Sequence, residues 1–133
     1  MMTSLVPRTL VLVAVLVLAF AGAAWAQGPW TAPEAEKGKK SPVAASPKAV
    51  EQGAKVAKAN CVTCHGASGK GDGAAAAALN PKPADWTSKR VQDESDGELY
   101  WKISNGRGAM PPWKHLPEND RWALIQYIRT LKK

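Results

Sequence analysis

The sequence predicts an all-α fold in which three to four short helices are joined by long connections rich in glycine and proline. Two observations support this class. Apolar residues recur at helical spacing in three segments, and no stretch alternates between apolar and polar residues as a half-buried strand does. The chain of 133 residues has room for one small domain and shows no internal repeat.

The first predicted helix begins at the Ser46-Pro47 pair and runs directly into Cys61. Serine is a good N-cap, and proline suits the first helical position because it needs no hydrogen bond there. One face of this helix carries small or apolar residues at helical spacing, namely Val50, Gly53 and Ala57.

Two further helices are predicted in the second half of the chain. Ser95 and Glu98 form a capping-box pair at the start of one, and Gly106 ends it. The other begins near Pro117. Their apolar stripes are Leu99, Tyr100 and Ile103 in the first, and Leu124, Tyr127, Ile128 and Leu131 in the second.

The segment between the first helix and these two is irregular. It carries four glycines between 66 and 73, yet it lacks the Gly-Lys-Ser/Thr ending and the preceding strand of a nucleotide-binding loop. Residues 74–79 are a short helical candidate because alanine has the highest helix propensity, and Pro81 and Pro83 end it.

The N-terminus has the pattern of an export signal. Arg8 precedes an apolar run from Leu10 to Phe20, and Ala24-Trp25-Ala26 offers a cleavage site, so residues 1–26 are predicted to be a signal peptide. The competing interpretation is an uncleaved membrane anchor through residues 10–26. Residues 27–46 are rich in Pro, Ala and Lys and predict a disordered linker, which leaves 47–133 as the folded domain.

The chain is basic, with a formal charge of +7, or +6 after cleavage because Arg8 is the only charge removed. No block of five or six like charges occurs, which argues against nucleic acid as the partner. A positive excess of this size favours protein partners with acidic surfaces.

The Cys61-Val62-Thr63-Cys64-His65 segment carries the chemistry, because Cys-x-x-Cys-His is the attachment signature of c-type haem. Two cysteines three residues apart on a helical turn face the same way, so both thiols reach one porphyrin, and His65 projects towards the iron. A thioredoxin-like redox pair would need a βαβ context, and a zinc site would need more ligands than one cysteine pair and a histidine. We therefore predict one covalently attached haem c.

Met110 is the predicted second axial ligand of the iron. It is the only methionine beyond the export signal, and it lies in a loop where glycines allow close approach and two prolines stiffen the chain. His115 is the other candidate ligand. Histidine and methionine together raise the reduction potential and fill both axial positions.

From Ser46 onward the chain resembles a class I c-type cytochrome, specifically the small bacterial mono-haem type. The resemblance rests on the haem motif, the Met110-Pro111 loop, the Gly69 to Gly73 stretch and the final helix. It implies the cytochrome c fold around one haem, in which Gly53 and Tyr127 mark the crossing of the first and last helices. Ala57 departs from the aromatic residue that the family commonly has in the first helix.

The resemblance also implies a supporting shell around the haem. The backbone carbonyl of a proline in the following loop, Pro81 or Pro83, would accept a hydrogen bond from the proximal histidine. Three tryptophans are candidates either for the haem wall and propionate contacts or for simple core filling: Trp86, Trp101 and Trp113.

These residues predict a periplasmic, monomeric electron carrier that is not itself an enzyme. A haem subunit docked permanently on a larger oxidoreductase is the alternative, and contact with a membrane requires an uncleaved N-terminus. A sensor or peroxidase-like enzyme would need an open iron position or an output domain, which Met110 and the short chain disfavour. The basic residues expected to border the haem crevice and meet redox partners are Lys70, Lys82, Arg107 and Lys114.

Overall fold

The computed structural model describes residues 28–133, so the predicted signal peptide lies outside the described residues. Within that range the chain forms helices and no strand, which confirms the all-α prediction. None of these helices is long and apolar enough to cross a membrane. The three longer helices are α3 (Pro47–Asn60), α6 (Asp96–Asn105) and α7 (Glu118–Thr130); single turns are α2 (Glu34–Lys37), α4 (Val62–His65), α5 (Lys89–Gln92) and the 3-10 turn η2 (Ala76–Ala78).

The ends of the longer helices follow their sequence signals. The Ser46 hydroxyl caps α3 by accepting from the backbone N–H of Ala49 at 3.1 Å. The Ser95 hydroxyl likewise accepts from the N–H of Glu98 at 3.1 Å and caps α6. At the other end of α6, Gly106 turns the chain with a φ of 62°, a conformation that glycine adopts without strain.

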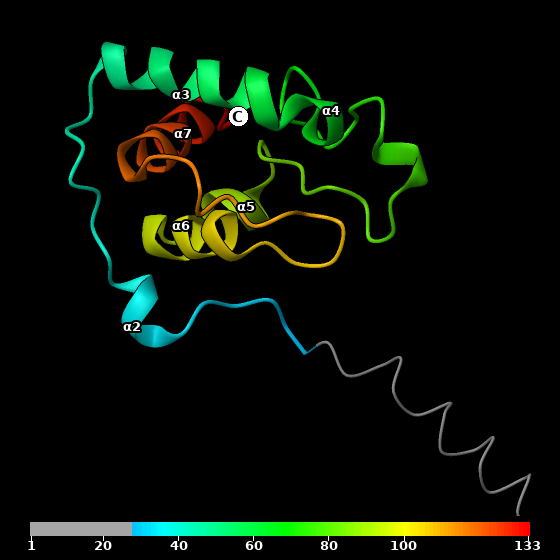
Figure 1. Cartoon of the computed structure of the whole chain (residues 1–133), viewed down its shortest axis with the longest axis horizontal. Helices are drawn as coiled ribbons and strands as arrows, with labels where there is room; N and C mark the ends of the chain where they lie inside the picture. The colour runs from blue at the N-terminus through cyan, green and yellow to red at the C-terminus, as the bar shows by residue number, and fades with distance from the viewer. Residues whose placement is uncertain (1–27) are drawn as a thin grey trace, which may run out of the picture. The chain divides into compact units, whose positions relative to one another are not determined.

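Helices α3 and α7 cross each other (Figure 1), and their backbones approach closely at Gly53. A Cβ atom on Gly53 would lie 2.0 Å from the carbonyl oxygen of Ala123 and 2.9 Å from Cβ of Tyr127. Two side chains of α7, Trp122 and Ile125, are fully buried in the core. The predicted meeting of Gly53 with Tyr127 is therefore confirmed.

We expect Gly53→Ala to lower the free energy of unfolding by about 1–3 kcal/mol, because overpacking at this contact outweighs the better helix propensity of alanine. Thermal unfolding of the haem-loaded chain measures it. Gly38→Ala is the matched control, since a Cβ there meets nothing within 4 Å. Equal midpoints for Gly53→Ala and wild type would show that the crossing is not tightly packed.

Residues 31–46 differ from the disordered linker that their composition predicts. They hold α2, which packs against α6, and we call them the strap. The Ser95 hydroxyl donates to the carbonyl of Lys37 at 2.9 Å, and the Gln126 side chain donates to the carbonyl of Val43 at 2.9 Å. A Cβ on Gly97 would lie 2.1 Å from the carbonyl oxygen of Glu36. Backbone groups of the strap thus make contacts with α6 and α7, and Ala32 and Val43 add apolar ones.

Candidate functional site

The cysteine pair and its histidine occupy one helical turn at the junction of α3 and α4. The backbone N–H of Cys64 donates to the carbonyl of Cys61 at 3.1 Å, and that of His65 donates to the same carbonyl at 2.9 Å. Both cysteines are free thiols and half-buried. Burial raises the pKa of the Cys61 thiol to about 11, with a smaller contribution from Cys64. The turn thus presents two thiols and an imidazole together.

His65 is held by a hydrogen bond from its ring to the chain. Nδ1 donates to the carbonyl of Ala84 at 3.0 Å, because a carbonyl oxygen only accepts. Pro81 and Pro83 were the candidates from sequence, and the partner is instead the residue after Pro83. Burial lowers the pKa of His65, partly offset by the Ala84 carbonyl, so the ring is neutral near pH 7. A neutral ring with Nδ1 protonated leaves the lone pair of Nε2 available to a metal.

The glycine-rich loop, residues 66–73, is hydrogen-bonded to this turn. Backbone N–H groups of Gly71 and Gly73 donate to the carbonyls of His65 and Cys64 at 2.8 and 3.1 Å, which satisfies the end of α4. A Cβ on Gly71 would lie 2.4 Å from the carbonyl oxygen of Pro83. Glycine is therefore needed for the loop to lie against the segment that carries Ala84. The predicted helix over the alanine run is reduced to the three residues of η2.

The three tryptophans singled out from sequence take different places. Trp86 is buried in the core and stacks on the His65 ring, with centroids 4.5 Å apart. Trp113 is half-buried, and its ring lies 5.4 Å from that of His115. Trp101 lines a cavity beside α6. Of the three, Trp86 is the one in contact with the cysteine–histidine turn.

Met110 lies in a tight turn anchored to α6. Arg107 and Met110 exchange two backbone hydrogen bonds of 2.9 and 3.0 Å, and the N–H of Trp113 donates to the carbonyl of Ile103 at 3.1 Å. Met110 is half-buried and packs against the hydrophobic core, whereas His115 is exposed. Of the two candidate sulfur and nitrogen ligands, Met110 is therefore the one that contacts the core.

The residues present fit a covalently bound haem. Two unpaired thiols share one turn with an imidazole whose Nε2 is available, and Cys61 and Met110 both pack against the margin of the same hydrophobic core. This arrangement offers two covalent anchors, a nitrogen ligand and a sulfur ligand. The sequence analysis did not identify the Ala84 carbonyl as the partner of His65. The nearby prolines, Pro81 and Pro83, were the only sequence signal in that segment.

Comparison with known proteins agrees with this chemistry. The family described as cytochrome c oxidase, cbb3-type, subunit III matches residues 48–128. A solved chain of the Kuenenia stuttgartiensis reducing HAO-like protein complex matches with 27% identity and a TM-score of 0.61. That match covers 69% of this chain and 47% of the other, so it spans about half of that relative's length. No curated protein gives a significant match. Because the family match extends over more than half of the sequence, the chain belongs to the cbb3-type cytochrome c oxidase subunit III family and is a small c-type cytochrome with one covalently bound haem c.

Proposed function

We propose that this chain shuttles single electrons between redox proteins in the periplasm, with its iron held by His65 and Met110. When bound, haem c supplies the one-electron couple. The observation that carries the proposal is the hydrogen bond from His65 Nδ1 to the Ala84 carbonyl, which fixes the ring and leaves the lone pair of Nε2 available to a metal. Residues 1–26 would direct export as a signal peptide.

Each residue of the site has a separate task in this proposal. Cys61 and Cys64 form the thioether bonds, and Met110 closes the second axial position. With both positions filled by protein side chains, a substrate reaches the iron only by displacing a ligand. The chain's residues therefore serve electron transfer rather than bond-making chemistry, and exclude water through the packing of Met110 and Trp86.

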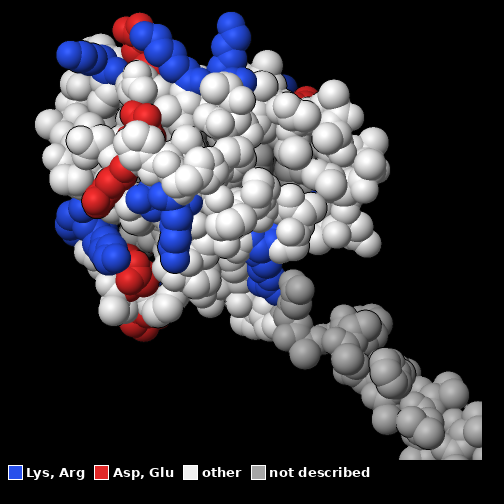
Figure 2. All heavy atoms as spheres, in the orientation of Figure 1, with Lys and Arg blue, Asp and Glu red and all other residues white. Residues whose placement is uncertain are grey.

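The distribution of charge favours brief docking with acidic partners. On the face shown in Figure 2, charged side chains gather towards the side where α3 begins, and the opposite side of that face shows few. Lys70 and Lys82 lie between α4 and α5, and Arg107 and Lys114 lie between α6 and α7; the three lysines are exposed and Arg107 is half-buried. Positive charges at a contact surface raise the rate of encounter more than the affinity, which suits a carrier that must leave again.

Electron transfer to an acidic partner should slow steeply with salt, because the Debye length shrinks from about 30 Å at 0.01 M to about 10 Å at 0.1 M. Changing the four residues above to Gln should flatten this dependence. A control chain with four other exposed lysines neutralised should keep most of it; these are Lys48, Lys55, Lys58 and Lys89. A wild-type rate insensitive to salt, or equal effects of the two quadruple variants, would rule out steering by the predicted residues.

A haem subunit docked on a larger oxidoreductase is the second candidate. It is favoured by the family description, which names an oxidase subunit, and by the relative from a protein complex. Size-exclusion chromatography of a native periplasmic extract separates the two candidates. A free carrier elutes near its monomer mass, and co-elution of all haem-bearing chain with a large complex would overturn free shuttling.

A further inference from the structure

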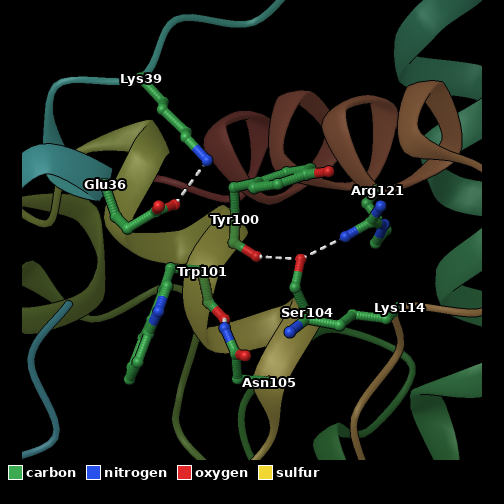
Figure 3. Close-up of a pocket in the computed structure, with 8 residues that line it drawn as sticks. All are labelled: Glu36, Lys39, Tyr100, Trp101, Ser104, Asn105, Lys114 and Arg121. Atoms are coloured by element: carbon green, nitrogen blue, oxygen red, sulfur yellow. Dashed lines mark hydrogen bonds and ion pairs between the residues drawn. The ribbon is translucent and has the colours of Figure 1, made fainter. Parts of the chain in front are cut away.

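A second site lies between the strap, α6 and the start of α7. It is a cavity of about 410 Å³, within the range of small-molecule sites. None of Cys61, Cys64, His65 and Met110 lines it. Figure 3 shows the lining residues, which are Glu36, Lys39, Tyr100, Trp101, Ser104, Asn105, Lys114 and Arg121.

The guanidinium of Arg121 is held in place at this cavity. It lies over the Tyr100 ring, 4.6 Å from the centroid, and its Nη1 donates to the Ser104 hydroxyl. That hydroxyl in turn donates to the Tyr100 carbonyl at 2.7 Å (Figure 3). Tyr100 itself stacks on the fully buried Trp122, with centroids 4.1 Å apart. A cation positioned by core residues in this way keeps its orientation without any ligand.

Arg121 lacks a counter-ion within the described part of the chain. Its Nε is buried and has no hydrogen-bond partner there. On the opposite wall, Glu36 pairs with Lys39 at 2.7 Å, so that carboxylate is already compensated. Lys114 at the rim is exposed and forms no ion pair with residues 28–133. The walls thus carry a net charge of +2, and partly buried cations are normally paired.

We propose that this cavity binds a small aromatic carboxylic acid, with its carboxylate held by Arg121 and Lys114. The planar fork of a guanidinium matches the two oxygens of a carboxylate. Ser104 and Asn105 also line the cavity and add a hydroxyl and an amide group. Trp101 lines it as well and offers an aromatic ring against which the body of the acid can pack. Because Glu36 and Lys39 belong to the strap, a bound acid would also fasten the strap to the domain. The site shares Lys114 with the proposed docking residues, but none of Cys61, Cys64, His65 and Met110 lines it.

The test is a titration of the haem-loaded, ¹⁵N-labelled chain with benzoate, followed by NMR at the Arg121 Nε–H. Benzamide is the neutral isostere, and inorganic phosphate is the competing oxyanion. Benzoate should shift the Arg121 signal with saturation and slow hydrogen exchange at the strap amides of Lys37 and Lys39, which donate within the strap. Benzamide should not bind, and phosphate should bind more weakly than benzoate.

Variants that each remove one positive charge test the site, and one of them serves as the control. Arg121→Gln should weaken benzoate binding at least about tenfold, and Lys114→Gln about fivefold, as expected for hydrogen bonds to charged groups. Arg121→Gln removes a side chain that contacts the core and is the variant at risk of misfolding. Lys114 is exposed, so Lys114→Gln should fold normally and tests the site in that case. Lys48→Gln removes the same charge from α3 and should leave the affinity unchanged. Equal affinities for Lys114→Gln and Lys48→Gln, equal binding of benzoate and benzamide, or tighter binding of phosphate would each overturn the proposal.

Discussion

Replacing both Cys61 and Cys64 by alanine should abolish the haem-loaded protein, and either single change should greatly lower its yield. The two thiols are the chain's only covalent anchors, and they share one turn with His65. A domain of this size builds only a small core unaided, so the chain without haem should show little tertiary structure. Haem absorbance per chain and near-ultraviolet circular dichroism measure the two effects.

Thr63→Ala is the control for the cysteine variants, because Thr63 lies in the same turn with its side chain exposed. It should retain full haem content. A cooperatively folded, haem-free double cysteine variant would show that the domain does not need the haem to fill its core, and the account of the fold would then be wrong.

Met110→Ala should leave the haem attached but open one axial position of the iron. Met110 is the methionine that packs against the core in the described part of the chain, and its turn is closed by the two hydrogen bonds with Arg107. The methionine–iron charge-transfer band near the red end of the oxidised spectrum should disappear, and the reduction potential should fall.

The matched variant is His115→Ala, which removes the other candidate ligand. His115 is exposed beside Trp113, so this variant should keep both the band and the potential. If wild type lacks the band, or if His115→Ala loses it while Met110→Ala does not, the ligand assignment is wrong.

Most of the helical framework could be predicted from the sequence, because the signals that begin and end helices are local. Ser46 and Ser95 accept the hydrogen bonds expected of N-caps, and Gly106 ends α6 as predicted. The close approach at Gly53 was also predictable, since the family resemblance marks that position. Five residues, 61–65, specify the cofactor because their spacing alone brings the thiols and imidazole into one turn.

Features that depend on backbone or long-range contacts were not predictable. The strap is ordered by main-chain contacts with α6, which composition does not reveal. Lys102 is buried between Glu94 and Glu98, at 2.7 and 3.0 Å, although a lysine is normally exposed. Arg129 donates to the carbonyl of Gln92 at 2.9 Å and pairs with Asp96. The two partners of Arg129 are 37 and 33 residues away in the sequence, and such contacts leave no periodic pattern.

We propose that a single haem, attached at the turn of Cys61, Cys64 and His65, carries one electron at a time. Mass spectrometry of the purified chain combined with a reductive titration tests this proposal. We predict a mass increase of one haem, located on the peptide that contains residues 61–65, and one Nernst wave with a one-electron slope. A chain that carries no covalent haem, or a titration that requires two electrons or a second centre, would contradict the account.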